Sequence, residues 1–461
     1  MASGHRFHPT ILREYDIRGI VGETLFPEDA SAIGRAFATI ARRRGGRRIC
    51  VGRDGRLSSP ALTEALIAGL RGGGVDVVDL GLGPTPMMYF AVHELDTDGG
   101  IQVTGSHNPP SHNGFKMMLG KASFFGEQIQ ELGRLAAAGE FSEGAGGYEE
   151  VEVHDRYVSR LARDYRGTRP LDVVWDAGNG AAGPAMAALA ARLPGRHHCL
   201  FAEVDGRFPN HHPDPTEPHN LEALIAAVQA RGAEIGIAFD GDGDRIGVVD
   251  GRGRILWGDQ LLMILAEDLL ARLPGATIIA DVKASQTLFD RIAELGGKPL
   301  MWKTGHSLIK AKMVETGAPL SGEMSGHIFY KDGFYGHDDA LYVAVRLLDI
   351  LGRGKRTLAE LRDAMPTTFS TPEVRFPCPE ERKFAAVAEL VVALQRDGAD
   401  VDTIDGVRVR TADGWWLLRA SNTQAVLVAR AEATSADGLE RLKEEVRARL
   451  RSVGLEPPAS F

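Results

Sequence analysis

Three aspartates separated by single glycines, Asp240, Asp242 and Asp244, follow the apolar run EIGIAF. Carboxylates at this spacing can converge on one hard divalent cation through oxygen ligands. A calcium EF-hand does not fit, because its sixth and twelfth positions are Arg245 and Gly251 rather than Gly and Glu. The alternative is a solvated acidic turn. In such a turn the three carboxylates repel one another unless their charge is neutralised. The pattern therefore favours a metal site.

A serine suited to carrying a covalent group stands in the string TGSHNPP at residues 104–110. Gly105 permits a tight turn, and the residue before a proline is pushed towards extended geometry. We therefore expect Ser106 at the tip of a stiff loop, where a nucleophile must be presented. His107 and Lys116 lie close to it in sequence. A Ser/Asn/Pro-rich surface turn is the alternative explanation.

Two further loops carry groups suited to a phosphorylated sugar. The string GEMSGH at 322–327 offers a carboxylate, a hydroxyl and an imidazole, which suit the reading of sugar hydroxyls. The string RASNT at 419–423 sets an arginine beside two hydroxyls and an amide, which suits a phosphate dianion. Each loop, taken alone, is better explained as an ordinary polar turn.

The string GNGAAG at 178–183 matches a dinucleotide-binding fingerprint, with Glu203 and Asp205 about 20 residues further on. A glycine turn that lets a helix pack closely is the alternative. It is favoured, because the serine, acidic and terminal loops have no part in dinucleotide binding. The chain contains no GxxxxGK[ST] string of a P-loop.

The elements that must position these loops follow a repeated pattern. Three times an apolar run ends in a polar turn, a helical segment follows, and a second apolar run comes after it. Each copy predicts a βαβ unit, and the turn aspartates Asp54, Asp176 and Asp281 recur at domain-sized spacing. We therefore expect three related α/β domains.

The end of the chain has a different pattern. Short β-prone runs followed by a charged amphipathic helix predict a separate α+β domain with antiparallel pairing. The predicted strands are 407–410, 415–419 and 425–431, and the predicted helix is 436–450. Gly- or Pro-containing stretches near Gly147, Gly251 and Pro366 are the predicted boundaries, which gives domains 1–147, 148–251, 252–366 and 367–461.

Composition excludes several other classes of protein. The 461 residues are 44% hydrophobic and 25% charged, as in folded globular chains, and the net charge of −9 argues against nucleic-acid or anionic-membrane surfaces. No signal peptide is visible, and the most apolar helical stretch, 261–273, contains Glu267 and Asp268. The absence of a CxxC pair fits a reducing compartment, and we expect the cytoplasm; the cysteines are Cys50, Cys199 and Cys378.

Together with EYDIRG at 14–19, the four loops resemble the α-D-phosphohexomutase family, most closely its bacterial phosphomannomutase/phosphoglucomutase branch. The strings EYDIRG, TGSHNPP, DGDGDR, GEMSGH and RASNT cover nearly the whole chain in the right order. The resemblance implies an α/β fold: three similar α/β domains with mixed sheets plus a smaller α+β C-terminal domain around a central cleft.

The resemblance also implies the residue roles. Ser106 is the serine phosphorylated in the active enzyme, and one Mg²⁺ per chain is held by Asp240, Asp242, Asp244 and a phosphoserine oxygen. The residues that bind the sugar hydroxyls are Glu323, Ser325 and His327. The residues that bind the phosphate of the substrate are Arg419, Ser421, Asn422 and Thr423. Supporting positions that line the cleft are Tyr15, Arg18, His107, Lys116, Arg245, Lys283 and His306, with Lys116 a candidate general acid or base.

The implied reaction is reversible phosphoryl transfer between C1 and C6 of mannose and glucose phosphates, through a hexose 1,6-bisphosphate that also serves as activator. Phosphoglucosamine mutase, from the same family, is the nearest alternative. That branch usually carries Ser-Ala-Ser-His-Asn at the serine loop and a glutamine in the sugar loop, where this chain has Val103-Thr104-Gly105-Ser106 and Met324. A dinucleotide-binding oxidoreductase and a non-enzymatic binding protein are more distant alternatives. Hexose phosphates are the expected partners, with no nucleic acid, membrane or obligate protein partner.

Overall fold

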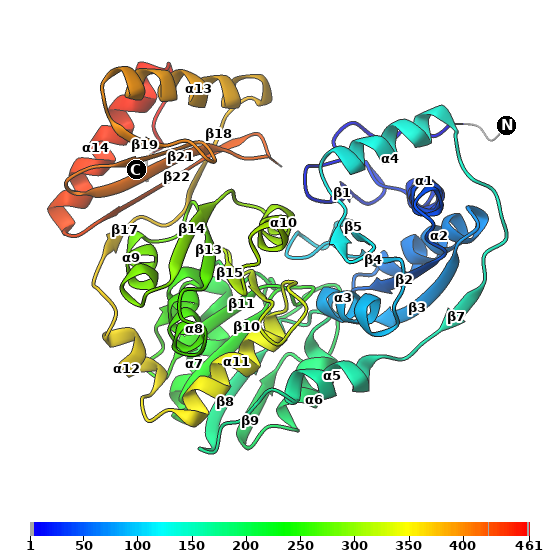
Figure 1. The fold of residues 1–461 in the computed structure, drawn as a ribbon, viewed down its shortest axis with the longest axis horizontal. Helices are drawn as coiled ribbons and strands as arrows, with labels where there is room; N and C mark the ends of the chain where they lie inside the picture. Colours follow the sequence, from blue (N-terminus) through cyan, green and yellow to red (C-terminus); the bar gives the residue numbers. More distant parts are fainter. Residues whose placement is uncertain (1–3, 423, 459–460) are drawn as a thin grey trace.

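Four β-sheets follow one another along the chain in the computed structural model, which describes residues 4–422, 424–458 and 461. In Figure 1 the first unit, blue to cyan, lies at the right, and the fourth, orange to red, lies at the upper left. The second and third units, green to yellow, lie below and between them. The fold class expected from the sequence, α/β with a fourth α+β unit, is confirmed.

The first sheet has the order β1-β5-β4-β2-β3-β7, with β6 paired to β5. Strands β2 and β3 are parallel and are joined by α2, as the first βαβ pattern predicts. The elements are β1 (Ile17–Ile20), α1 (Pro27–Arg43), β2 (Arg48–Arg53), α2 (Ser59–Gly72), β3 (Asp76–Leu82), α3 (Thr85–Glu94), β4 (Gly99–Val103), β5 (His112–Leu119), β6 (Ala122–Ser123), α4 (Glu127–Ala138) and β7 (Tyr148–Glu150).

The second sheet has the order β12-β11-β10-β8-β9. Strands β8 and β10 are buried along their whole length, as expected of parallel strands covered on both faces. The elements are α5 (His154–Ala162), β8 (Leu171–Asp176), α6 (Gly183–Ala190), β9 (Gly195–Leu200), the 3₁₀ turn η1 (Pro218–Leu221), α7 (Glu222–Arg231), β10 (Ile235–Phe239), β11 (Ile246–Asp250) and β12 (Ile255–Leu256).

The third sheet has the order β14-β13-β15-β16. Its long helix α11 begins at an N-cap aspartate, Asp339, whose side chain accepts a hydrogen bond from the Tyr342 amide. The elements are α8 (Gly258–Arg272), β13 (Thr277–Asp281), α9 (Gln286–Glu294), β14 (Lys298–Trp302), α10 (His306–Thr316), β15 (Leu320–Gly322), β16 (Ile328–Tyr330), α11 (Ala340–Arg353) and α12 (Leu358–Asp363).

The fourth sheet pairs its strands antiparallel in the order β17-β22-β21-β20-β19, with β18 also paired to β22. Strand β20 spans the predicted residues, and β21 extends one residue beyond each predicted end. Strand β22 begins one residue later and ends two residues later than predicted, and the last helix ends two residues later. The elements are β17 (Phe369–Ser370), β18 (Val374–Pro377), α13 (Glu380–Arg396), β19 (Asp400–Asp402), β20 (Val407–Arg410), β21 (Gly414–Ala420), β22 (Val426–Ala433) and α14 (Ala436–Ser452).

The first three sheets share one arrangement of four strands. In each, the two strands of a βαβ unit are parallel, a third parallel strand lies beside the first, and a fourth strand is antiparallel to the third. The corresponding orders are β5-β4-β2-β3, β11-β10-β8-β9 and β16-β15-β13-β14. The sheets are therefore mixed, as expected, and the internal repeat is structural as well as sequential.

The apolar core is divided in a way that sets the fourth unit apart. One continuous cluster of buried side chains joins α3 of the first unit to the second and third units, and α1 and α2 pack in a further cluster of the first unit. The fourth unit has its own core, which includes Trp416, Leu418 and Leu442. The fourth sheet therefore has a core of its own, while Trp415 and Leu417 on β21 pack against Val282 of the third unit.

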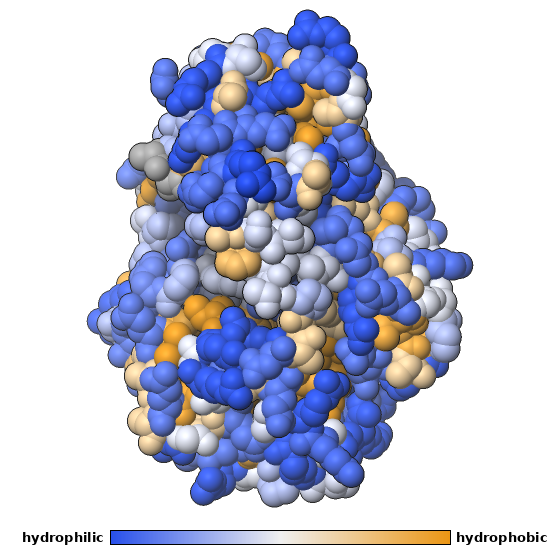
Figure 2. Space-filling model, turned by 90° about the vertical axis from the view of Figure 1, so that its left-hand side faces the viewer, coloured by the Kyte–Doolittle hydropathy of each residue, from blue (hydrophilic) through white to orange (hydrophobic). Residues whose placement is uncertain are grey.

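The surface seen from the side of the fourth and third units is mainly hydrophilic, with apolar residues in separate patches (Figure 2). Within the described residues, no helix is both long and apolar enough to span a membrane.

Candidate active site

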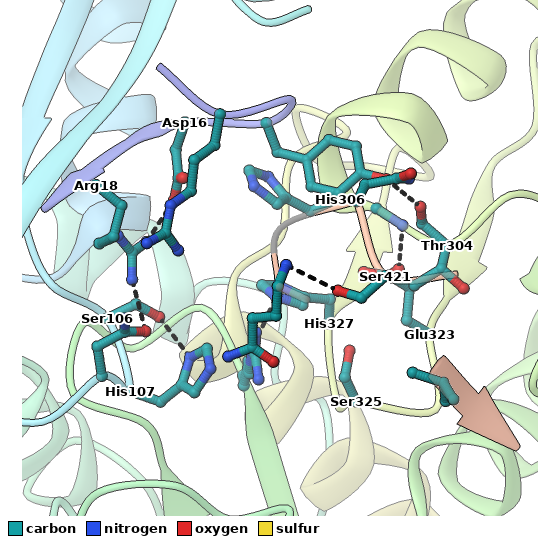
Figure 3. Close-up of a pocket in the computed structure, with 18 of the residues that line it drawn as sticks. Asp16, Arg18, Ser106, His107, Thr304, His306, Glu323, Ser325, His327 and Ser421 are labelled. Atoms are coloured by element: carbon teal, nitrogen blue, oxygen red, sulfur yellow. Dashed lines mark hydrogen bonds and ion pairs between the residues drawn. The ribbon is translucent and has the colours of Figure 1, made fainter. Parts of the chain in front are cut away.

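Most of the residues singled out in the sequence line one cleft that is formed by all four units, while Asp240, Asp242 and Asp244 lie behind its lining (Figure 3). The first unit supplies the serine loop, the second Arg245, the third the GEMSGH loop and the fourth Arg419 and its neighbours. The lining residues include Tyr15, Arg18, Ser106, His107, Lys116, Arg245, Lys283, His306, Glu323, Ser325, His327, Arg419, Ser421 and Asn422. Thr423 lies outside the described residues.

The serine, acidic and GEMSGH loops occupy equivalent places in the first three sheets. The serine, acidic and GEMSGH loops connect the third strand of the shared arrangement to its antiparallel neighbour: β4 to β5, β10 to β11 and β15 to β16. The RASNT loop likewise joins two antiparallel strands, β21 and β22. The repeat therefore brings equivalent hairpins of the first three units to one cleft.

Ser106 has the backbone conformation of a residue held in a tight loop. Its φ is 48°, a left-handed conformation that costs an L-residue energy and persists only where surrounding contacts impose it. Its hydroxyl Oγ donates to Asp240 Oδ2 at 2.9 Å and lies 3.1 Å from His107 Nδ1. Burial, together with the nearby charges of Arg245 and Arg18, lowers the pKa of His107 well below its ordinary value. His107 is therefore a neutral partner of the serine.

The three aspartates are buried directly behind the serine. One carboxylate oxygen from each of Asp240, Asp242 and Asp244 lies within 4.8 Å of the other two. Burial and the neighbouring Asp242 and Asp244 carboxylates raise the pKa of Asp240 well above its ordinary value. Among the described residues, Asp242 Oδ1 and Asp244 Oδ1 have no hydrogen-bond donor although they are buried. Oxygen ligands, mutual repulsion and unpartnered oxygens fit a hard divalent cation.

Lys116 compensates part of this negative charge. Its Nζ lies 2.8 Å from Asp242 Oδ2 and also contacts Asp244 Oδ2. Burial by itself lowers the pKa of Lys116, but Asp242 and Asp244 outweigh burial and raise it. The ammonium group therefore keeps its protons in this arrangement and neutralises part of the charge of the two carboxylates.

The imidazole of His327 is held between the second and third units. Arg245 Nε donates to His327 Nε2 at 2.9 Å, so the neutral ring carries its proton on Nδ1, which lies 3.0 Å from Asp338 Oδ2. Lys310 in turn lies 2.9 Å from Asp338 Oδ1, and His306 stacks on His327 with ring centroids 5.4 Å apart. The position and tautomer of His327 are therefore fixed from several sides.

Contacts between units close over the other end of the cleft. Tyr15 of the first unit donates from its hydroxyl to the carbonyl of Thr304 at 3.0 Å and accepts from Asn422 Nδ2 at 2.6 Å. The Gly305 amide donates to Glu323 Oε1 at 2.6 Å. The structure therefore shows the fourth unit in contact with the first across the cleft.

Two buried cations face this end of the cleft, each fixed by a carboxylate. Arg419 Nε donates to Asp405 Oδ2 at 3.0 Å, and the pKa of Arg419, lowered by burial, is raised on balance by that carboxylate. Lys283 Nζ donates to Glu373 Oε2 at 2.9 Å. Preorganised cations of this kind suit a phosphate dianion.

Residues that the sequence analysis missed fall into two groups. Arg13, Asn108, Glu373, Arg375 and Gln424 line the cleft as well, while Asp338, Lys310, Asp405, Asp54 and Arg56 fix the lining residues from behind. Asn108 lay inside a quoted string, and Asp54 was noted only for its place in the repeat. No local sequence pattern marks the other residues, because their partners lie far away in sequence.

The glycine string at 178–183 has a packing role. Its residues are buried, and a Cβ at Gly183 would lie 2.0 Å from the carbonyl oxygen of Ala202. The Ala181 amide donates to the carbonyl of Gly241 in the acidic loop at 2.9 Å. The dinucleotide interpretation is therefore wrong: this turn packs a helix closely and supports the acidic loop.

Comparisons with known proteins agree along the whole chain. Family models of phosphoglucomutase/phosphomannomutase match in four parts: alpha/beta/alpha domains I, II and III at residues 9–143, 155–253 and 257–369, and the C-terminal domain at 373–449. Phosphomannomutase/phosphoglucomutase of Pseudomonas aeruginosa PAO1 is 47% identical over 456 residues, 98% of each chain. Phosphoglucomutase of Neisseria gonorrhoeae is 45% identical over 446 residues, 96% of this chain and 97% of the relative.

A solved structure is similar to the same extent. The crystal structure of a phosphoglucomutase/phosphomannomutase family protein from Burkholderia thailandensis superposes with a TM-score of 0.93 at 48% identity, covering 99% of this chain and 100% of the other. The order of the loops, the four-unit fold and the full-length matches lead to the same conclusion. The chain belongs to the phosphoglucomutase/phosphomannomutase family.

Proposed function

We propose that this enzyme interconverts hexose 1-phosphates and hexose 6-phosphates of glucose and mannose through a phosphoserine at Ser106 and a hexose 1,6-bisphosphate. One observation carries the proposal: the Ser106 hydroxyl lies 2.9 Å from Asp240 of the acidic triplet and faces a cleft lined by cations of all four units. Phosphoryl transfer depends mainly on positioning and charge neutralisation, which this arrangement supplies. The matching names of the relatives support the same reaction.

The reaction runs in two halves that use the same groups. The phosphoserine gives its phosphoryl group to the free hydroxyl of the bound hexose phosphate, and the bisphosphate forms. The bisphosphate then turns over in the cleft, and its other phosphoryl group passes to the Ser106 oxygen, which releases the isomeric hexose phosphate. In the first half the attacking sugar hydroxyl loses its proton and the departing Ser106 oxygen gains one. In the second half the Ser106 hydroxyl loses its proton and the departing sugar oxygen gains one.

The chain's own residues have separate tasks in this scheme. Arg18 and Lys116 offset the charge of the phosphoserine, which is nearly two negative charges. Arg419, with Ser421 and Asn422, holds the phosphate that does not react. Glu323 and Ser325 bind the sugar hydroxyls, while the ring nitrogens of His327, also expected to bind them, already face Arg245 and Asp338. Closure of the cleft by Tyr15 excludes water that competes for the phosphoryl group.

The cation is assigned as Mg²⁺, one per chain. Asp240, Asp242 and Asp244 would hold it, because they offer oxygen ligands only. When bound, the ion supplies neutralisation of charge on the phosphoryl oxygens.

The domain boundaries and the cytoplasmic location expected from the sequence stay predictions.

The sugar loop favours a dual-substrate enzyme. A loop that reads hydroxyls shared by glucose and mannose does not discriminate at C2, where these sugars differ. A coupled assay with glucose, mannose and glucosamine 1-phosphates, each with a trace of bisphosphate, tests this. Comparable kcat/KM for the first two and a much lower value for the third are expected. A wild-type preference between glucose and mannose above about a thousandfold, about 4 kcal/mol, contradicts the proposal.

A further inference from the structure

The serine loop is held by its backbone carbonyl groups. Every carbonyl from Gly105 to Pro109 accepts a contact from a side chain of another segment. Arg18 Nη1 donates to the Gly105 carbonyl at 2.8 Å, and His212 Nε2 contacts that of His107. The carbonyls of Ser106, Asn108 and Pro109 all accept from one residue, Arg56, at 2.7, 2.6 and 2.6 Å.

Arg56 follows β2 and has no direct access to the cleft. Its side chain is 1% exposed, and it is not among the residues that line the cleft. Its Nη1 makes a further hydrogen bond to the His112 carbonyl at 3.0 Å, so one guanidinium holds four carbonyls between residues 106 and 112. Lysine cannot reproduce this, because its donors radiate from a single atom while the guanidinium presents a planar fork.

Asp54 fixes Arg56 and the start of the loop together. Its Oδ2 lies 3.2 Å from Arg56 Nε and accepts hydrogen bonds from Thr104 Oγ1 at 2.8 Å and from the Gly105 amide at 3.1 Å. A Cβ at Gly105 would lie 2.3 Å from Arg56 Nε, so this glycine is what lets the guanidinium approach. The pair and the loop therefore form one buried unit.

This unit accounts for the conformation of the reacting serine. The φ of Ser106 is 48°, which an L-residue keeps only where contacts on both sides impose it. The carbonyl of Ser106 points to Arg56, while its Oγ points to Asp240. Fixing the carbonyl therefore fixes the direction of the Cα–Cβ bond, from which the contacts with Asp240 and His107 set the position of the oxygen that takes up the phosphoryl group.

We propose that Arg56 is the positioning residue of phosphoryl transfer: its guanidinium holds the carbonyls of the serine loop and thereby sets the attack geometry of Ser106 without touching substrate. This inference rests on the proposed function of Ser106. It predicts that loss of the guanidinium lowers the rate of transfer to and from Ser106, while substrate binding by Arg419 and the sugar loop is kept.

The test measures single-turnover phosphorylation of Ser106 by glucose 1,6-bisphosphate, by intact-protein mass spectrometry, in wild type, Arg56→Lys and Arg56→Ala. Displacing a reacting group by about 1 Å costs about a hundredfold in rate, and a loss of that size is expected in both variants. The KM for hexose phosphate should change less than the rate does. Millimolar guanidinium ion should restore part of the rate in Arg56→Ala and none in Arg56→Lys.

Arg346→Lys is the matched control, because Arg346 is also largely buried but lies on α11. It should lose stability and keep the phosphorylation rate. Hydrogen exchange gives a readout that does not need turnover: in Arg56→Lys, amides of residues 104–113 should exchange faster while those of the acidic loop stay protected. If Arg56→Lys does not fold, Asp54→Asn is measured in the same way and should show a smaller loss.

The outcomes separate the two proposals. If wild type and Arg346→Lys phosphorylate Ser106 about a hundredfold faster than the Arg56 variants do, both proposals stand. Phosphorylation of Arg56→Lys at a rate within threefold of wild type overturns the positioning role and leaves the proposed function intact. Absence of phosphorylation in wild type overturns both, whatever the exchange data show.

Discussion

At the scale of single residues, the proposed phosphoryl transfer requires Ser106 to be the group that carries phosphate. Ser106→Ala removes the oxygen but leaves the loop contacts of Arg18 and Arg56, which are made to backbone carbonyls. We expect kcat to fall by about a thousandfold or more, because a covalent route is lost, with unchanged folding. Steady-state kinetics and mass spectrometry of the peptide containing Ser106 measure this. Near-normal turnover in the variant would exclude a phosphoserine.

The acidic triplet gives a second prediction at this scale. Asp242→Asn weakens a ligand that also accepts from Thr85 Oγ1 at 2.5 Å. Mn²⁺ binding, followed by electron paramagnetic resonance, should weaken, and kcat should fall by about a hundredfold or more. Asp397→Asn, at a surface aspartate paired with Arg449, is the control and should change neither. Full activity in the presence of a strong chelator would rule out a catalytic metal.

Arg419 gives the third residue prediction. Charged hydrogen bonds contribute about 1.5–3 kcal/mol each, so Arg419→Ala should lower kcat/KM by about ten- to a few-hundredfold. Arg410→Ala, at an exposed arginine of the neighbouring strand β20, should stay within about twofold of wild type, as surface pairs contribute little. Phosphorylation of Ser106 should survive in both variants. An unaffected kcat/KM in Arg419→Ala would mean that RASNT is only a hairpin turn.

At the scale of elements, the strings predicted loops that the structure brings together at the cleft, and the repeated apolar runs predicted the βαβ units. The sequence did not show that the first three loops occupy equivalent hairpins, because strand pairing such as β15 with β16 involves very short segments. The sequence also did not show which residues fix the cleft-lining side chains in place. Asp338, Asp405 and Glu373 act through partners that only the fold brings near, so no local pattern marks them.

A prediction of how stability depends on pH concerns the segment between β9 and η1, which contacts the serine loop through His212. Its neighbour His211 lies 3.0 Å from Asp176 Oδ2; burial lowers the pKa of His211, but the carboxylate outweighs burial and raises it. Stability from this pair is present below the unfolded pKa and lost as pH rises through the folded pKa. The Tm advantage of wild type over His211→Gln should therefore be larger at about pH 6 than at about pH 8.

The control for this prediction is His219→Gln, at an exposed histidine of η1. Its Tm difference from wild type should not vary between the two pH values. An advantage over His211→Gln that is equal at both pH values would show that the pair does not contribute as a charged pair.

At the scale of the whole molecule, the fourth unit is a separate body that completes the site. It has its own core, and it meets the third unit through a small apolar cluster of Val282, Trp415 and Leu417. It also makes polar contacts, including Arg408 to the carbonyls of Val282 and Ala284 at 2.7 and 2.8 Å, and polar contacts can be exchanged as the unit rotates. The resting place of Arg419 therefore depends on how the fourth unit is placed.

This separation predicts closure on substrate. Residues 364–368, between α12 and β17, connect the third unit to the fourth and are the expected hinge. Small-angle scattering should show compaction when hexose phosphate is added to wild type and little compaction in Arg419→Ala. Equal profiles of wild type with and without substrate would contradict a mobile fourth unit.

Passage of phosphate between Ser106 and the sugar can be followed in a single-turnover experiment. Enzyme carrying ³²P on Ser106 is mixed with excess unlabelled glucose 1-phosphate and quenched within one turnover. The label should leave the protein no more slowly than glucose 6-phosphate forms, and it should appear first in glucose bisphosphate and then in glucose 6-phosphate. Label that stays on the protein while glucose 6-phosphate forms would contradict this transfer of phosphate.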